Sequence, residues 1–254
     1  RARSLLQYFV TRINDEIRPA FVVQLGDLIE EDEEEDEENY VKALGILKQL
    51  SMPVYHVVGN HEQVNLKLDQ VLTILKYPKL YYSFDSGDYH FVVLFASCPM
   101  KSDLESPVES IGRKIQIDTA QRKWLEEDLN ATKKATIVFL HHPLDDQDLA
   151  GSYWFEQKPD ECFVDARNEI REIFSRSGKV IAVFNGHVHR NNLENHDDIW
   201  YVSLQSLVEN MSEHTKTPAE TIAIVTVGEH EIRVEIEGMD PAEYRVDRGR
   251  KIPT

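Results

Sequence analysis

The sequence predicts a mixed α/β fold built from two packed sheets. Helical periodicity alternates with short apolar runs along most of the chain, an order typical of parallel strands joined by helices. Two pairs of strand-like runs, within 81–96 and 221–237, are separated by short turns and indicate antiparallel hairpins. The 254 residues are 41% hydrophobic, which is enough for one substantial core. We expect a single domain over residues 1–245 and a disordered tail over 246–254.

The helices are predicted from apolar side chains at helical spacing. Residues 4–17 place Leu5, Phe9, Ile13 and Ile17 four apart, on one face of an amphipathic helix. Further helices are predicted over residues 39–50, 64–76, 118–131 and 163–176.

The strands are predicted where a short apolar run ends in turn residues. The runs AFVVQL at 20–25 and PVYHVV at 53–58 are typical of buried parallel strands that open into a loop. The other strands are predicted at 81–84, 90–96, 135–140, 179–184, 199–204, 221–227 and 231–237. The segments 100–116 and 144–160 lack clear periodicity, so we expect long surface loops that carry substrate specificity.

The charge distribution limits the classes of partner. The formal net charge is −17, and residues 30–38 contain nine of the acidic side chains. We interpret that run as a solvated loop, because divalent cations prefer spaced and preorganised oxygens. No cluster of basic residues offsets the acidic surface, so a nucleic acid is not expected as substrate or partner.

Other features bear on the cellular compartment. No apolar run approaches the roughly 20 residues that a membrane-spanning helix needs, and the first residues do not resemble a signal peptide. The two cysteines, Cys98 and Cys162, have no disulfide or zinc-site spacing and are expected to be free thiols. A cytoplasmic location without membrane association is the resulting expectation.

Polar residues of metal-binding type follow four of the predicted strands. They are Asp27, Asn60 with His61, His141 with His142, and His187 with His189. Ligands gather at the carboxyl ends of strands in open α/β sheets, so these side chains are expected to meet. A carboxylate can bridge two cations, imidazoles suit zinc, iron or manganese, and two adjacent cations can activate water and clamp a phosphoryl group.

The motifs GD at 26–27, GNHE at 59–62, HHP at 141–143 and GHVH at 186–189, in this order, resemble the calcineurin-like metallophosphoesterase superfamily. The resemblance covers roughly residues 20–230. It implies a four-layer α/β/β/α sandwich with two mixed sheets and two divalent metal ions, Mn²⁺ or an Fe/Zn pair. It also implies hydrolysis of a small phosphate monoester or diester by a metal-bound hydroxide.

The resemblance implies a role for each motif residue. Asp27 would bridge both metals and His189 would bind the second, while His61 would be the general acid near the leaving group. The ligands implied for the first metal are Asn60, His141 and His187. Asn60 and His61 are also candidates for substrate contact. His142 would contact the substrate or serve only in packing, and Glu62 would orient a neighbouring imidazole or cap the following helix.

One family motif is absent from its usual place. The superfamily begins with a strand carrying D-x-H, and nothing before Asp27 matches it. The sequence at 88–90 reads DYH, but it follows GNHE and is expected in a hairpin turn. We expect the missing strand to precede Arg1 in the full protein. The alternatives are a shortened relative with a weakened second metal site, and a metal-binding or protein-binding scaffold that has lost catalysis. The natural substrate, the metal pair and the oligomeric state are not determined by the sequence.

Overall fold

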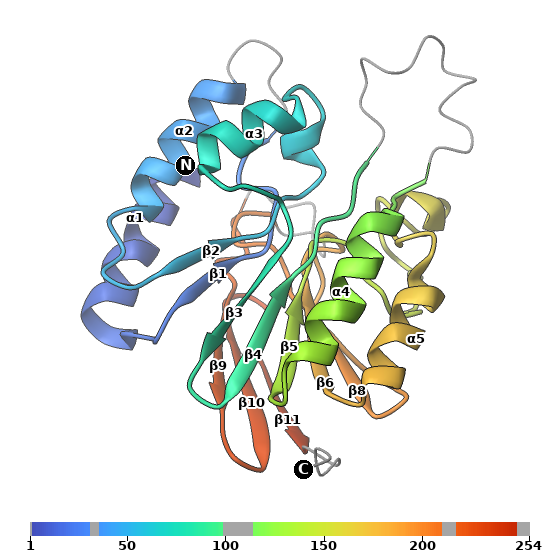
Figure 1. Cartoon of the computed structure of the whole chain (residues 1–254). Coiled ribbons are helices and arrows are strands. Elements are labelled where there is room, and N and C mark those ends of the chain that lie inside the picture. Colours follow the sequence, from blue (N-terminus) through green and yellow to red (C-terminus); the bar gives the residue numbers. More distant parts are fainter. Residues whose placement is uncertain (1, 31–35, 99–113, 210–216, 248–254) are drawn as a thin grey trace, which may run out of the picture.

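The computed structural model describes residues 2–30, 36–98, 114–209 and 217–247 (Figure 1). Its α-helices are α1 Ala2–Arg12, α2 Asp36–Leu47, α3 Leu68–Leu75, α4 Thr119–Ala131 and α5 Arg167–Ser177. Its strands are β1 Val22–Gln24, β2 Val54–His56, β3 Tyr82–Ser86, β4 Tyr89–Val93, β5 Ala135–Phe139, β6 Val180–Asn185, β7 Asn192–His196, β8 Ile199–Ser203, β9 Ile222–Val227, β10 Glu231–Glu237 and β11 Ala242–Asp247. Short helical turns cover Ile13–Ile17, His61–Gln63 and Pro159–Glu161.

A six-stranded sheet in the order β3-β4-β5-β6-β8-β7 forms the largest layer. Its four middle strands run parallel, and the hairpins β3/β4 and β7/β8 add an antiparallel strand at each edge. This arrangement confirms the predicted mixed α/β fold.

The remaining strands differ from the expected second mixed sheet. β1 and β2 form a parallel pair, while β9, β10 and β11 form a separate antiparallel sheet. Within the described part of the chain, β1 pairs only with β2 and β9 only with β10, so no strand joins the two groups by hydrogen bonds. A single mixed sheet would require such a joining strand.

The central strands of the six-stranded sheet, β4, β5, β6 and β8, are buried on both faces. Alternate side chains of a strand point to opposite faces, so Val138 packs toward α4 and α5 while Ile137 packs toward β10. Helices α4 and α5 cover the first face (Figure 1), and their side chains Leu125 and Phe174 are fully buried there. This two-sided burial explains why the central strands have nearly continuous apolar sequences.

Helices α1 and α2 pack on the outer side of β1 and β2. Val10 of α1 and Ile46 of α2 share an apolar cluster with Val22 and Val54 from the two strands. In Figure 1 these helices lie on the side of the molecule opposite α4 and α5. The two groups of strands whose ends carry the motifs are therefore covered by α1 and α2 on one side of the molecule and by α4 and α5 on the other.

Two strands were not predicted from the sequence. β7 and β11 read NLENH and AEYRVD, and most of their side chains are exposed or half-buried. Both lie at the edge of a sheet, where an apolar pattern is not needed. β11 extends to Asp247, two residues into the segment expected to be a tail, and the rest of that tail lies outside the described residues.

The DYH segment also differs from its expected position. Tyr89 and His90 belong to β4 rather than to the turn, because the hairpin turns at Gly87 and Asp88. The expected loop at 100–116 lies mostly outside the described residues. Among the described helices, none is long and apolar enough to cross a membrane.

Candidate metal centre

The motif residues meet because their strands run parallel. Gln24 pairs with His56 at the ends of β1 and β2, so the loops that follow these strands lie side by side. Phe139 pairs with Phe184 near the ends of β5 and β6 in the same way. The packing of the two strand groups then brings all four loops to one edge.

Three side-chain atoms converge on Nε2 of His141 and form a four-atom cluster with it. Oδ2 of Asp27 lies 2.8 Å from this nitrogen, Oδ1 of Asn60 lies 3.1 Å away, and Nδ1 of His187 lies 3.2 Å away. His141 and His187 are buried. The structure thus brings together the residues that sequence reasoning assigned to the first metal.

In His141 and His187, the ring nitrogen that points away from the cluster is held by a backbone carbonyl, and this determines which nitrogen faces the cluster. Nδ1 of His141 donates to the carbonyl of Leu25 at 2.7 Å, and Nε2 of His187 donates to the carbonyl of Glu161 at 3.0 Å. In the neutral rings the inward nitrogens therefore carry lone pairs. With the carboxylate and amide oxygens they make four acceptors directed at one another, which is the donor set of a divalent cation.

Burial and mutual charge set the protonation of these groups. Burial opposes the charge of Asp27, but the adjacent His141 outweighs it and holds the pKa of Asp27 well below its ordinary value. Burial lowers the pKa of His141, yet the Asp27 carboxylate more than compensates and the net shift is upward. Burial and repulsion from His141 lower the pKa of His187 to about 3. Ionised Asp27 and neutral His187 are the forms that bind a metal.

Glu62 joins the two loops that supply Asp27 and Asn60. Its carboxylate accepts backbone N–H bonds from Asp27 at 3.0 Å, Leu28 at 2.5 Å and Gly59 at 2.8 Å. Burial and the charge of Asp27 raise the pKa of Glu62 above its ordinary value. Glu62 therefore holds the backbone of both loops, whereas the sequence suggested that it orients an imidazole or caps a helix.

Two glycines are required by close approach. A Cβ on Gly26, which has φ +100°, would overlap the ring of His141, and a Cβ on Gly59 would overlap the Asp27 carboxylate. Asp27 itself has φ +53°, a left-handed conformation that non-glycine residues seldom adopt. The GD and GN pairs thus reflect a tight contact between two loops.

The GHVH turn contains two further left-handed residues, His187 at φ +64° and His189 at φ +53°. Backbone strain of this kind persists only where surrounding structure determines it. Nδ2 of Asn185 donates to the carbonyl of Gly186 at 3.0 Å and to Oγ of Ser203 at 2.9 Å. Nε2 of Gln147 donates to the same Ser203 hydroxyl at 2.7 Å, and all three side chains are buried.

His189 lies outside the four-atom cluster. Its Nδ1 is 2.8 Å from Oε2 of Glu209, whose pKa is lowered by that contact. A carboxylate on one ring nitrogen orients the other toward a ligand. The run SLQSLVEN at 203–210, which contains Ser203 and Glu209, also resembles the family, but the sequence predicted no role for Glu209, Gln147 or Ser203.

His61 sits at the exposed side of the centre. Its backbone N–H donates to Oδ1 of Asp27 at 2.9 Å, and its ring Nε2 lies 3.9 Å from Oδ2 of Asp27. The other ring nitrogen lies 4.0 Å from a carboxylate oxygen of Glu30. The side chain is 26% exposed, so it can reach a bound molecule.

His142 is closer to the centre than the sequence implied. Ligand atoms of His141, His142 and His187 all lie within 4.8 Å of one another. Nε2 of His142 is 3.4 Å from Sγ of Cys98, and its buried Nδ1 has no hydrogen-bond partner. Burial and the neighbouring imidazoles keep the pKa of His142 well below its ordinary value. The neutral ring therefore adds a lone pair beside the cluster.

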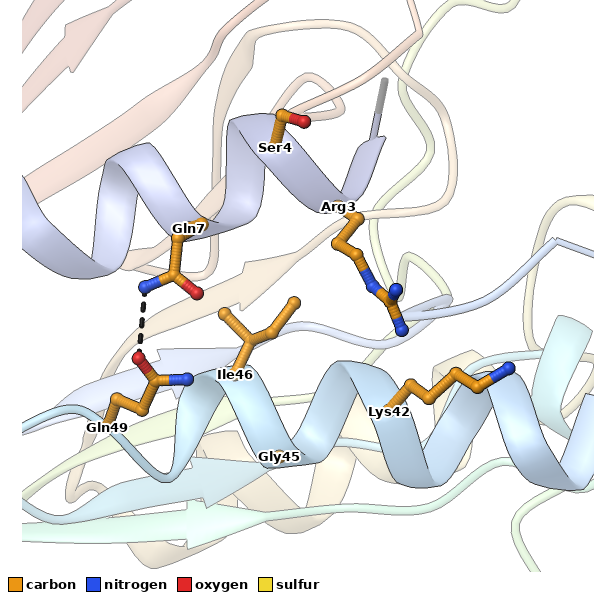
Figure 2. A pocket seen from close by; sticks show the side chains of 7 residues that line it. All are labelled: Arg3, Ser4, Gln7, Lys42, Gly45, Ile46 and Gln49. Carbon is orange, nitrogen blue, oxygen red and sulfur yellow. Dashed lines mark hydrogen bonds between the residues drawn. The ribbon is translucent and has the colours of Figure 1, made fainter.

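A separate hollow of about 590 Å³ lies between α1 and α2 (Figure 2). It is lined by Arg3, Ser4, Gln7, Lys42, Gly45, Ile46 and Gln49. Gln7 and Gln49 are joined across it by a hydrogen bond of 3.0 Å. None of the motif residues lines this hollow.

Comparison with solved structures identifies similar folds. A dimetal phosphatase from Danio rerio superposes with a TM-score of 0.73 at 17% identity, over 96% of this chain and 88% of that one. The purple acid phosphatase PPD1 of yellow lupin (Lupinus luteus) gives 0.63 at 15% identity, over 96% of this chain and 49% of that one. GAP50, the anchor in the inner membrane complex of Plasmodium, gives 0.59 at 15% identity, over 99% of this chain and 85% of that one.

Sequence comparison identifies the family. The model of calcineurin-like phosphoesterases matches residues 2–191, which include all four motifs. The chain belongs to the calcineurin-like phosphoesterase family. No curated protein matches the sequence significantly.

Proposed function

We propose that the protein hydrolyses small phosphate monoesters or diesters with the help of two divalent cations, Mn²⁺ or an Fe/Zn pair. The observation that carries this proposal is the convergence of acceptors from Asp27, Asn60, His141 and His187. Four converging acceptors, two of them on buried histidines, repel one another without a cation, so the arrangement suits a bound metal. Membership of a phosphoesterase family supplies the reaction class.

Each ligand has a distinct task in this proposal. The first cation would be held by Asn60, His141 and His187. The second cation would be held by His189, and Asp27 would contact both. The cations would supply activation of water and neutralisation of phosphoryl charge. Glu62 would hold the loops of Asp27 and Asn60 side by side through its backbone hydrogen bonds, and Glu209 would orient the ring of His189. His142 would line the centre beside His187.

The second position has fewer ligands than the first. Within the described residues it has only Asp27 and His189 as candidates.

His61 is proposed as the general acid. Its backbone bond to Asp27 fixes it beside the carboxylate, and its partly exposed ring can reach a leaving-group oxygen. His61→Ala should lower kcat by about 100-fold or more on an ester with a poor leaving group. Metal content should remain unchanged. Full turnover by this variant would disprove the role.

The central experiment combines metal analysis with a substrate screen. Protein purified with Mn²⁺ is measured for metals per chain and assayed on one chromogenic monoester and one diester. Turnover that a chelator removes and Mn²⁺ restores supports the enzyme, and His141→Ala should lose both metal and turnover. His230→Ala, an exposed histidine far along the chain, is the matched control.

A non-catalytic scaffold of the same fold is the second candidate. It is favoured by the incomplete second position and by the likeness to GAP50, which is described as an anchor. Bound metal without chelator-sensitive turnover on either ester would favour the scaffold.

A further inference from the structure

His142 adds a third imidazole to the pair formed by His141 and His187. A ligand atom of each ring lies within 4.8 Å of those of the other two, and all three side chains are buried. The ring centroid of His142 lies 4.3 Å from that of His187 and 4.9 Å from that of His141. Two nitrogens on one zinc ion lie at most about 4.2 Å apart, so the three rings need to close by at most about 0.6 Å to share an ion.

The contacts of Cys98 determine which nitrogen of His142 carries the proton. A buried thiol keeps its proton at neutral pH, and Sγ of Cys98 donates it to the carbonyl of Ala96 at 4.0 Å. Nε2 of His142 lies 3.4 Å from the same sulfur. Because the single thiol proton is directed at Ala96, the sulfur accepts from His142, and Nε2 is the protonated nitrogen.

The sulfur is itself held in place by the GNHE loop. The backbone N–H of Cys98 donates to Oε1 of Gln63 at 2.9 Å, and Nε2 of Gln63 donates to the carbonyls of Gly59 and Ala96. Gln63 is buried. The acceptor for His142 is therefore fixed by the loop that also carries Asn60.

This tautomer leaves a lone pair on Nδ1 of His142. That nitrogen is buried and has no hydrogen-bond partner among the described residues. A buried acceptor without a partner is unfavourable, so Nδ1 requires a partner from outside the described chain. Metal-binding histidines have this arrangement, in which one ring nitrogen donates to a fixed group and the other binds the ion. His141 and His187 show it too, with backbone carbonyls as the fixed groups.

We propose that Nδ1 of His142 is a further ligand of the first cation and makes this position selective for zinc over manganese. The inference rests on the proposed function, because it places that cation at Asn60, His141 and His187. Imidazole nitrogen suits zinc, whereas manganese is better matched by carboxylate, carbonyl and water oxygens. A third imidazole therefore raises the affinity for zinc more than that for manganese. Of Mn²⁺ and an Fe/Zn pair, it favours the pair that contains zinc.

The first test compares the affinities of the metal-free protein for Zn²⁺ and Mn²⁺ by calorimetry. His142→Leu should lower the affinity for Zn²⁺ by about 100-fold and that for Mn²⁺ by less than about tenfold. His142→Asn places an amide oxygen near the position of Nδ1, so it should recover Mn²⁺ binding but not Zn²⁺ binding. His56→Leu is the matched control. Its Nδ1 is also buried without a hydrogen-bond partner, but among the described residues His56 belongs to no group of metal-type side chains, so both affinities should stay unchanged.

The role of the sulfur is tested separately. Cys98→Val removes the acceptor for Nε2 of His142 and should lower the affinity for Zn²⁺ by about tenfold. Cys98→Ser keeps an acceptor at this position and should retain most of that affinity. Equal Zn²⁺ affinities in the two variants would show that Cys98 does not set the tautomer.

Nitrogen NMR of isotope-labelled histidine gives a readout in the wild type that no folding defect can mimic. Saturation with Zn²⁺ should shift the Nδ1 resonance of His142 and leave Nε2 protonated. An Nδ1 resonance that keeps its metal-free position would assign a buried water to this nitrogen and overturn the inference. An equal loss of Zn²⁺ and Mn²⁺ affinity in His142→Leu would overturn the selectivity.

Turnover on the two chromogenic esters separates this inference from the proposed function. Zinc selectivity that depends on His142, without turnover on either ester, would overturn hydrolysis and leave the zinc site. Chelator-sensitive turnover by a protein whose Zn²⁺ affinity is unaffected by His142→Leu would overturn the zinc site and leave hydrolysis.

Discussion

The carboxylate of Asp27 lies 2.8 Å from Nε2 of His141, although the two residues follow strands of different sheets. Asp27 follows β1 and His141 follows β5, so their contact depends on how the two groups of strands pack. The shared apolar core, to which Val23 of β1 and Phe139 of β5 both contribute, sets that packing. The contact therefore couples the metal centre to the stability of the fold.

Metal binding should stabilise the protein. The convergent acceptors are satisfied by a cation in the folded state only, so Mn²⁺ at 100 times its Kd should raise the free energy of unfolding by about 2.7 kcal/mol. Denaturant titrations with chelator and with Mn²⁺ measure the difference. His141→Ala should abolish it, while the exposed His230→Ala should keep it. An equal shift in both variants would place the metal elsewhere.

Glu62→Gln should weaken both the fold and the metal centre. The substituted amide has one acceptor oxygen instead of two, so its NH2 group would face at least one of the backbone N–H groups of Asp27, Leu28 and Gly59. Loss of charged hydrogen bonds should lower the free energy of unfolding by about 3 kcal/mol. Metal affinity should fall by about 10- to 100-fold, measured by calorimetry. Glu172→Gln, on an exposed position of α5, is the control and should change neither quantity.

Replacing glycine by alanine should abolish metal binding at one position and stabilise the fold at another. Gly59→Ala places a methyl group against the Asp27 carboxylate, so metal binding should be lost. Gly45→Ala, in the middle of α2, meets no atom within 4 Å and should stabilise the protein by about 0.5 to 1 kcal/mol. Metal titration and thermal unfolding of both variants check the pair. Normal metal affinity in Gly59→Ala would show that the two loops can separate.

His90 should make stability depend on pH. Its Nε2 lies 2.8 Å from Asp128 of α4 and its Nδ1 lies 2.7 Å from Asp85 of β3, which itself pairs with Lys134. The bond to Asp128, opposed by burial and supported by Asp85, raises the pKa of His90 above 6.5. Because the folded pKa is raised, the added stability is fully present below pH 6.5 and is lost as pH rises through the folded pKa. Asp85 has a lowered pKa, so its share is lost at the acid end, as pH falls below 3.8.

The measurement is the free energy of unfolding across this range. The free energy of unfolding of the wild type should fall as pH rises above 6.5, and His90→Gln should not show this fall. His230→Gln should behave as wild type. The same slope in His90→Gln would assign the effect to another group.

The sequence by itself determined the order of elements and most ligand candidates. Apolar runs such as those before Gly26 and His141 must be buried as strands, and polar residues directly after them must lie at strand ends. The sequence also determined family membership, since four short motifs in fixed order are retained. It missed β7 and β11, because edge strands tolerate polar residues and lose the pattern that burial imposes.

Only the tertiary structure decided how the motif residues act together. The three N–H bonds to Glu62, the carboxylate of Glu209 on His189, and the link from Gln147 through Ser203 to Asn185 join segments far apart in the chain. Such contacts leave no local pattern, because the hydrogen-bond partner of a buried group is set by packing rather than by spacing. The exposed Tyr153 and Trp154 illustrate the same point, since exposure of an aromatic ring depends on whether the fold covers it.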